Sequence, residues 1–575
     1  MLKLKKISTS IWPYLLIFIT SIIIISPQLI NHSTIIGSDA LFHFNRFYDA
    51  AKQIQTGNFS YFQTNFGFQQ SGRLINGMYG PLFAYMNGLL LLATHSWFNY
   101  EMASNLILFM VGGCGMYKLT QFLKSSRCVG ILITIMFLSS GWMPCWAIGQ
   151  NMMAWGAAFS PYALIIAIRM VKEPNDAIHI GPLVLIMAII SQIHILSTLM
   201  YILLFIPFFI FAWLNTTNKQ HLGLQLFKSV GLTLALSANI WGSFLVMYSE
   251  NYIATPGAFK LAENALSIGF LPGSRNYLNI VLILVLLFQI LWVAIHWKKS
   301  RVNTFITIIG LIYLWISSVL FPWKIFDILT PKLETTLQFP VRFDIIAYPL
   351  LFAGLAISLN QLKSEKKSIN FLMYISLMIG AFFLTYGTLI KMVDKSIVYQ
   401  HAGLNSWVKT KTIATSLHEI QWTTTSKNPG NLLILVDKSH PDYLPIPYPD
   451  RQRTKRSSAY EKQIIKPYRY FYHKVTKDGK LILIWNSKHT GKQRIPVITY
   501  AETAVYLNGK HLKHYEISNI GAPLVTVKKG INRLSISFRT PLYFKILLIL
   551  MFIGWVMMIY WLVKIGVSYI GRLQI

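Results

Sequence analysis

The chain has 575 residues, of which 54% are hydrophobic and only 13% charged, and its formal net charge is +32. A soluble globular domain carries about 25% charged residues, whereas charge is missing here from long stretches such as 11–30 and 281–297. Apolar runs of about 20 residues match the thickness of a bilayer core. The composition therefore excludes an ordinary soluble protein and predicts an integral membrane protein.

The first apolar run, 11–30, follows a lysine-rich start. A signal peptide has a similar layout, but this run is long and no small-residue cleavage site follows it, so we expect a retained membrane anchor. Eleven further spans are expected in this reading of the hydropathy pattern. They lie near 101–123, 128–146, 153–171, 178–195, 197–214, 222–247, 276–297, 302–320, 342–360, 369–392 and 541–567.

The positive charges beside the short loops orient these spans. If about twelve segments cross, every Lys and Arg cluster at a short loop faces the cytoplasm, and so do both termini. The count requires that the apolar piece 81–94 does not cross. It is short and contains Asn87 and Gly88, so we expect it to lie at the outer interface.

Three regions follow from this topology. A transmembrane domain is expected over 1–392, with an outer loop at 31–100 that carries juxtamembrane helices. Residues 393–540 are expected to form an extracytoplasmic domain, and 541–575 a final transmembrane helix with a cytoplasmic tail. Alternating segments predict strands, and Asn508-Gly509 predicts a tight hairpin, so a β-sandwich-like domain is expected. The predicted strands are 481–485, 496–500, 505–507, 525–527 and 534–538.

The predicted outer domain is strongly basic. Residues 393–540 contain 24 Lys and Arg against 9 Asp and Glu, a net charge of +15, and the densest run includes Arg451, Arg453, Lys455 and Arg456. Two interpretations remain open: attraction to anionic lipid headgroups, or affinity for an anionic cell-envelope polymer or a lipid-linked phosphate. Nucleic acid is not an expected partner, because a domain outside the membrane does not meet it.

The segment after the first span has the most chemical content. Asp39, His43 and Arg46 are four and three residues apart, so they share one face of a predicted helix. An acid, an imidazole and a guanidinium at a membrane surface could deprotonate a hydroxyl and hold a phosphate. The alternative is that Asp39 or Ser38 caps a surface helix while the other two side chains point to lipid headgroups.

Two other segments bear candidate residues on the same side. Arg342 and Asp344 stand where a span enters the membrane; Arg342 could clamp a lipid-linked phosphate or merely reach lipid phosphate. His194 lies at the outer turn of a helical hairpin, where a lone histidine is more often a satisfied polar group than a ligand. The cysteines, Cys114, Cys128 and Cys145, accompany apolar helices and indicate no disulfide framework.

In their order along the chain, several motifs resemble the GT-C superfamily of membrane glycosyltransferases. The motifs are Gly37-Ser38-Asp39 with His43 and Arg46, Tyr79-Gly80-Pro81-Leu82, the His194 turn and Gln338-Phe339-Pro340-Val341-Arg342-Phe343. More narrowly, they are similar to the bacterial membrane proteins labelled "6-pyruvoyl-tetrahydropterin synthase-related", a YfhO-like group. The resemblance covers most of the chain, from residue 1 to about 400, and the outer β domain with its closing helix also fits.

The resemblance implies a GT-C-like fold and transfer of a sugar from a polyprenyl-phosphate donor to an outer-surface acceptor. Asp39, with His43, would be catalytic, and a divalent metal could sit near Asp39. Arg46, His194, Gln338 and Arg342 would bind substrate. Many GT-C enzymes have a second acid in an outer turn that here reads 149–155 without one, which puts metal dependence and activity in doubt.

Two other functions stay open on sequence grounds. A transporter or flippase of lipid-linked saccharide would need polar groups at mid-membrane depth and internal repeats, whereas the ionisable residues cluster at span ends. A non-catalytic membrane platform that binds anionic polymer or lipid through the basic domain is the third candidate.

Overall fold

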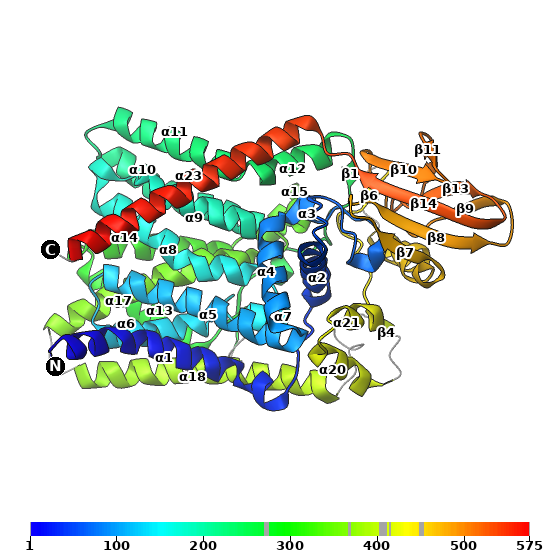
Figure 1. Cartoon of the computed structure of the whole chain (residues 1–575). Coiled ribbons are helices and arrows are strands. Elements are labelled where there is room, and N and C mark those ends of the chain that lie inside the picture. The colour runs from blue at the N-terminus through cyan, green and yellow to red at the C-terminus, as the bar shows by residue number, and fades with distance from the viewer. Residues whose placement is uncertain are drawn as a thin grey trace.

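The computed structural model consists of a bundle of long helices with a sheet region at one end (Figure 1). The described residues are 2–269, 275–365, 370–401, 411–412, 416–447 and 453–573. Both chain termini lie at the end of the bundle opposite the sheet region (Figure 1). We call the end that faces the sheets the site end.

Seven described helices are long and apolar enough to cross a membrane, as expected of a membrane protein. A bent pair, α11 (Lys219–Leu236) and α12 (Ala238–Ser249), turns by 65° and makes an eighth candidate if it is one span. The seven helices are α1 (Leu2–Asn31), α5 (Trp97–Phe122), α8 (Met153–Lys172), α10 (Ile195–Asn215), α17 (Asp344–Glu365), α18 (Asn370–His401) and α23 (Leu542–Leu573).

Four more expected spans coincide with shorter apolar helices. They are α6 (Arg127–Leu138), α9 (Ile180–Ile193), α13 (Ile280–His296) and α14 (Arg301–Ser317). A bilayer core needs about 20 residues per helix, and these have 12 to 17. Helix length thus supports seven or eight crossings, and the count of about twelve stays a prediction.

Two helices run crosswise to the bundle near its site end, α2 (Ala40–Thr56) and α4 (Pro81–Thr94) (Figure 1). A Cβ at Gly88 of α4 would lie 2.8 Å from the backbone nitrogen of Ala51 in α2, so only glycine permits this approach. The apolar piece 81–94 is therefore a short helix packed on α2, oriented differently from the long helices.

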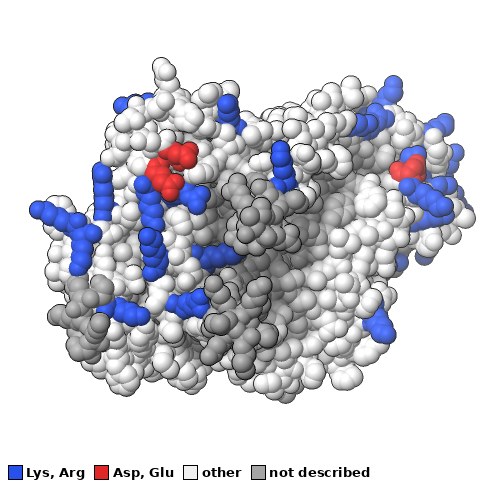
Figure 2. Space-filling model, turned by 60° about the vertical axis from the view of Figure 1, so that its left-hand side comes forward, with Lys and Arg blue, Asp and Glu red and all other residues white. Residues whose placement is uncertain are grey.

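Lysine and arginine side chains gather at both ends of the molecule, and the surface between them is largely uncharged (Figure 2). One group lies on the bundle end that carries the termini, the other on the sheet region. The distribution is the one expected when a bilayer covers the middle of a protein, because charged side chains are costly in hydrocarbon.

The sheet region contains two antiparallel sheets, ordered β11-β10-β14-β8-β7 and β12-β13-β9. Leu483 and Ile536 of the first sheet share one apolar core with Val525 and Val527 of the second. The strands are β7 (Tyr472–Val475), β8 (Leu481–Ser487), β9 (Gly491–Arg494), β10 (Thr503–Leu507), β11 (Lys510–Leu512), β12 (Glu516–Ile517), β13 (Pro523–Val527) and β14 (Gly530–Phe538).

The predicted hairpin at Asn508-Gly509 is confirmed. Leu507 pairs with Lys510, and the two turn residues have φ of 48° and 84°, the positive values that a two-residue turn of this kind requires. The predicted strand 496–500 is wrong. The backbone of this segment makes hydrogen bonds that belong to no β-ladder. Ile498 N donates to Ser71 O at 2.7 Å, and Thr499 N donates to Gly521 O at 2.9 Å.

The boundary predicted at residue 393 also needs correction. Helix α18 continues to His401, and α20 (Leu417–Thr425) and α21 (Gly430–Leu435) pack on the site end of the bundle. Trp97 Nε1, for example, donates to Pro429 O at 2.8 Å. The compact sheet region therefore begins only after these helices. Of the basic run, Arg451 lies outside the described residues and Arg456 is buried.

Short elements complete the connections near the site end. They are α3 (Asn76–Tyr79), α7 (Cys145–Gly149), α15 (Trp323–Leu329), α16 (Leu333–Thr336), α22 (Arg453–Tyr460), β1 (Tyr252–Ile253), β2 (Ser267–Ile268), β3 (Tyr277–Leu278), β4 (Lys411–Thr412), β5 (Val436–Asp437) and β6 (Pro445–Ile446). Strand β6 pairs with β1, which ties the segment after α21 to the loop after α12.

Candidate functional site

A cavity of about 420 Å³ lies where α2, the α9–α10 turn, the segment before α17 and the loop 438–443 meet. We call it the Asp39 cavity. It brings together residues that sequence reasoning selected from three distant segments. They are Asp39, His43, His194, Gln338 and Arg342. Arg46 does not line the cavity, and neither does Asp344, which is buried behind it.

The backbone around Asp39 is held by the outer turn 149–151. Asp39 N donates to Gly149 O at 3.3 Å, and Gly37 N donates to the side-chain oxygen of Gln150 at 3.0 Å. A Cβ at Gly37 would lie 2.3 Å from Gly149 Cα. Glycine at position 37 is therefore required for this contact, which explains the Gly-Ser-Asp sequence physically.

The capping alternative for Asp39 does not hold. Asp39 occupies the N-cap position of α2, but its carboxylate makes no capping hydrogen bond. The carboxylate faces Asn151 instead, whose Nδ2 is 3.4 Å from Oδ2. His43 and Arg46 are 2% and 0% exposed, so neither points to lipid headgroups. The predicted shared face is thus turned inward.

Glu101 of α5 anchors the chain that leads to Asp39. Its Oε2 accepts from Gln28 Nε2 at 2.8 Å and from Ile35 N at 2.9 Å. Its Oε1 accepts from Gln150 Nε2, which also donates to Ile35 O at 2.9 Å. Glu101 is 1% exposed, so this network is buried, and it fixes the segment 33–39 against the turn 149–151.

The charge around Asp39 is unbalanced. Burial raises the pKa of the Asp39 carboxyl, the cations Lys438, Arg275 and Arg342 oppose this rise in that order, and Asp442 adds to it. All five residues line the cavity. Three cations thus face two carboxylates, and the excess positive charge favours an anionic ligand.

His43 and Arg46 form a buried pair. Arg46 Nη1 donates to His43 Nδ1 at 3.2 Å, and since arginine only donates, His43 carries its proton on Nε2. Burial and the neighbouring guanidinium lower the pKa of His43 well below 6.5. His43 is therefore a neutral N–H donor at the cavity. Arg46 in turn lies over the Tyr79 ring at 4.7 Å and donates to Gly80 O at 3.3 Å.

Arg342 is held as a buried guanidinium without a carboxylate. Nη1 donates to Leu337 O at 2.6 Å and Nη2 to Gln338 Oε1 at 3.1 Å. The side chain is 8% exposed, and its Nε has no hydrogen-bond partner. Among the described residues Arg342 makes no ion pair. A second arginine, Arg275, lies between the Trp142 and Phe339 rings at 4.6 and 5.1 Å.

His194 interrupts the helical hairpin as predicted. It stands between α9 and α10, and the far ends of that hairpin meet where Thr217 N donates to Asn175 Oδ1 at 2.9 Å. Its Nδ1 is 2.9 Å from Ser197 Oγ. Burial, followed by the charges of Arg342 and Arg46, lowers the pKa of His194 to about 3. The imidazole is neutral near pH 7.

Sequence reasoning missed part of the lining. The loop Lys438-Ser439-His440-Pro441-Asp442-Tyr443 supplies one whole wall, and Tyr443 Oη is 3.4 Å from Tyr79 Oη. Asn151 of the outer turn 149–151 also faces Asp39 and was not selected from the sequence. No local signal marks Lys438, His440 and Asp442, because charged residues are at least as dense at 451–456. Asp442 also supplies a second carboxylate from a segment other than the predicted turn.

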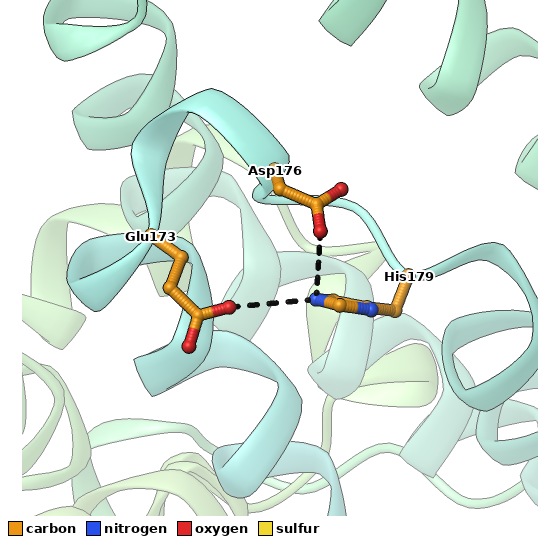
Figure 3. A group of neighbouring side chains, drawn as sticks. All are labelled: Glu173, Asp176 and His179. Carbon is orange, nitrogen blue, oxygen red and sulfur yellow. Dashed lines mark ion pairs between the residues drawn. The ribbon is translucent and has the colours of Figure 1, made fainter.

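One described group of side chains could hold a metal ion, but it is not at the cavity. Glu173, Asp176 and His179 follow the end of α8 that is remote from the turn 149–151 beside Asp39, and both carboxylates point toward the His179 ring (Figure 3). His179 Nε2 is 3.7 Å from an oxygen of each acid, and both acids are exposed. Among the described residues no such three-ligand group includes Asp39. The metal expected near Asp39 therefore finds no group of three His, Cys, Asp or Glu ligands at that residue in the part of the chain that the structure describes.

Comparison with known proteins does not assign this chain to a family. Neither a protein-family model nor a curated protein matches this chain. The GT-C-like and YfhO-like resemblance thus rests on the motifs themselves.

Proposed function

We propose that this protein is a membrane glycosyltransferase that moves a sugar from a polyprenyl-phosphate donor to an acceptor at the outer surface. The observation that carries the proposal is the Asp39 cavity, in which three cations and two carboxylates, Asp39 and Asp442, converge beside the ends of apolar helices. The phosphate of a lipid-linked sugar is an anion that would lie at the level of these helix ends. The sugar attached to it would extend into the cavity.

The three cations of the Asp39 cavity are suited to stabilise the phosphate group that leaves the sugar. Arg342 has a desolvated guanidinium with an unused N–H at Nε, and arginine binds phosphate through two parallel hydrogen bonds. A charge that develops on the leaving phosphate is stabilised most by donors already in place. Arg275 and Lys438 add positive charge from two other segments.

Asp39 suits the acceptor side of the reaction. An acceptor hydroxyl gives its proton to the Asp39 carboxylate, and its oxygen forms a bond with the anomeric carbon. The bond between that carbon and the phosphate oxygen breaks, and the phosphate keeps the electron pair. The raised pKa of Asp39 improves it as a base, because a general base works best when its pKa approaches the working pH.

The test is an assay in reconstituted vesicles with polyprenyl-phosphate sugars and cell-envelope acceptors. Asp39→Asn should abolish sugar transfer while leaving melting temperature and membrane yield unchanged. Asp478→Asn, at an exposed carboxylate paired with Lys480, is the matched control. Full transfer by Asp39→Asn would overturn the assignment. Donor binding without turnover in the unsubstituted protein would favour a binding platform instead.

A further inference from the structure

A second cavity, of about 180 Å³, is also lined by residues of α2. Its lining comes from α2, the loop 66–70, α21 with β5, and the segment 468–469. We call it the Gln70 cavity. We propose that the Gln70 cavity binds one neutral sugar ring of a glycan acceptor. The role of this sugar as part of an acceptor rests on the proposed function. Its binding to the cavity does not and can be tested separately.

The lining combines hydrogen-bonding groups with aromatic faces. Gln69, Gln70 and Asp437 place amide and carboxylate groups in the lining, and Tyr48 and Tyr468 line it as well. Gln69 Nε2 already donates to Asp437 Oδ1 at 3.1 Å and Gln70 Nε2 to Asn65 O at 3.0 Å, so a ligand would use the second N–H of each amide and the remaining lone pairs of the carboxylate. Hydroxyl groups of a sugar can donate to a carboxylate and bond with amides, while its C–H faces pack on aromatic rings. Ligand pockets usually pair apolar walls with a few placed polar groups.

Size and charge narrow the ligand class. Pockets for drug-sized ligands span about 300–1,000 Å³, so 180 Å³ suits a smaller molecule such as one sugar ring. The lining has one acid, Asp437, and one base, Arg469. It therefore lacks the cationic excess of the Asp39 cavity and favours a neutral ligand.

The backbone that presents the two glutamines is strained. Phe68, Gln69 and Gln70 are consecutive non-glycine residues with φ of 53°, 53° and 47°, a left-handed region that is unfavourable for L-residues and concentrates at functional sites. The strain is held from α2. Asn45 Oδ1 accepts from Phe68 N at 2.6 Å, and Asp49 Oδ1 accepts from Phe66 N at 2.7 Å.

The two cavities are neighbours. Asp437 lines the Gln70 cavity, and the next residue, Lys438, lines the Asp39 cavity. Phe68, which precedes Gln69, contacts Phe42 and His440 of the Asp39 cavity with ring centroids 5.7 and 5.5 Å apart. We place in the Gln70 cavity a sugar that neighbours the reacting one in the acceptor chain.

The experiment measures binding of free glucose, galactose and N-acetylglucosamine to the full chain in detergent micelles by saturation-transfer NMR. At least one sugar should bind, and Gln70→Ala or Asp437→Asn should weaken its apparent affinity about tenfold, the loss expected for one hydrogen bond with a charged or buried partner. Leu433→Trp, which fills the cavity without removing a polar group, should abolish binding. Asp478→Asn is the surface control.

Each result separates this inference from the proposed function. Binding that survives the three variants but is lost in Arg342→Gln would place the sugar in the Asp39 cavity, overturning the inference and supporting the transferase. Absence of binding by all three sugars, or equal binding by all variants, would also overturn it. A variant that loses its melting transition is replaced by Tyr468→Phe, which removes only the hydroxyl that approaches Gln70 Oε1 at 3.4 Å.

Discussion

The side-chain oxygen of Gln338 accepts a hydrogen bond from Arg342 Nη2 at 3.1 Å, while its Nε2 donates to Gly257 O at 2.8 Å. Gln338 therefore links the Arg342 guanidinium to the loop 256–259, which lines one side of the Asp39 cavity. Gln338 itself has φ of 58°. The backbone at this residue is therefore strained in the conformation that directs the side chain to Arg342.

We expect Gln338→Ala to raise the KM for the polyprenyl-phosphate donor about tenfold and to change kcat little. The reason is that Arg342 loses one partner of a charged hydrogen bond but keeps its charge. Steady-state kinetics in vesicles give the split between the two constants. Gln55→Ala, at an exposed glutamine of α2, is the control. Equal KM values in both variants would contradict a positioning role.

A second prediction concerns pH. If Asp39 is the base, the transfer rate falls at acid pH as its carboxylate takes up a proton, and this limb lies above the ordinary value of 3.8 because burial raises the pKa. Lys438 opposes the rise more than any other cation. Lys438→Gln removes that charge, so the pKa of Asp39 rises further and the acid limb moves to higher pH.

The pH–rate profile of kcat/KM measures this shift, with Lys477→Gln at an exposed lysine of the sheet region as control. The two profiles should differ in the acid limb alone. A limb that stays in place, or moves to lower pH, would mean that the titrating group is not a carboxyl beside Lys438.

Local periodicity explains what could be predicted from the sequence. Asp39, His43 and Arg46 share a face because a helix repeats every 3.6 residues, and the Asn508-Gly509 turn needs only residues in sequence. Most of the expected apolar spans contain a helix, although the segment 128–146 is helical only to Leu138 and again from Cys145. These features depend on neighbours in the chain, so they can be read without knowing the tertiary structure.

Other features depend on contacts across hundreds of residues. The loop 438–443 reaches the cavity because β6 pairs with β1, and no periodic pattern in either segment indicates that pairing. The segment 496–500 alternates as a strand should, but its backbone partners are Ser71 and Gly521. Burial of Arg456 in a run of positive charges likewise could not be inferred from composition.

Gly37→Ala should damage the site by sterics alone. The new Cβ would lie 2.3 Å from Gly149 Cα, so the segment that carries Asp39 must move from the turn 149–151. Overpacking of this kind costs about 1–3 kcal/mol, and we expect a lower melting temperature together with loss of transfer. In Gly231→Ala no atom lies within 4 Å of the added Cβ. That control should melt no lower than the unsubstituted protein, and equal melting of the two variants would contradict the contact.

Glu101→Gln should loosen the same segment without touching the cavity. The Glu101 carboxylate accepts hydrogen bonds from three donors, Gln28, Ile35 and Gln150. A glutamine side chain turns an N–H₂ toward at least one of them, which leaves a buried donor unsatisfied at a cost of about 1–3 kcal/mol. We expect a lower melting temperature and a reduced kcat. Exposed Glu263→Gln tests whether loss of a negative charge alone has this effect. Unchanged melting and kcat in Glu101→Gln would show that Asp39 is positioned by the Gly149 contacts alone.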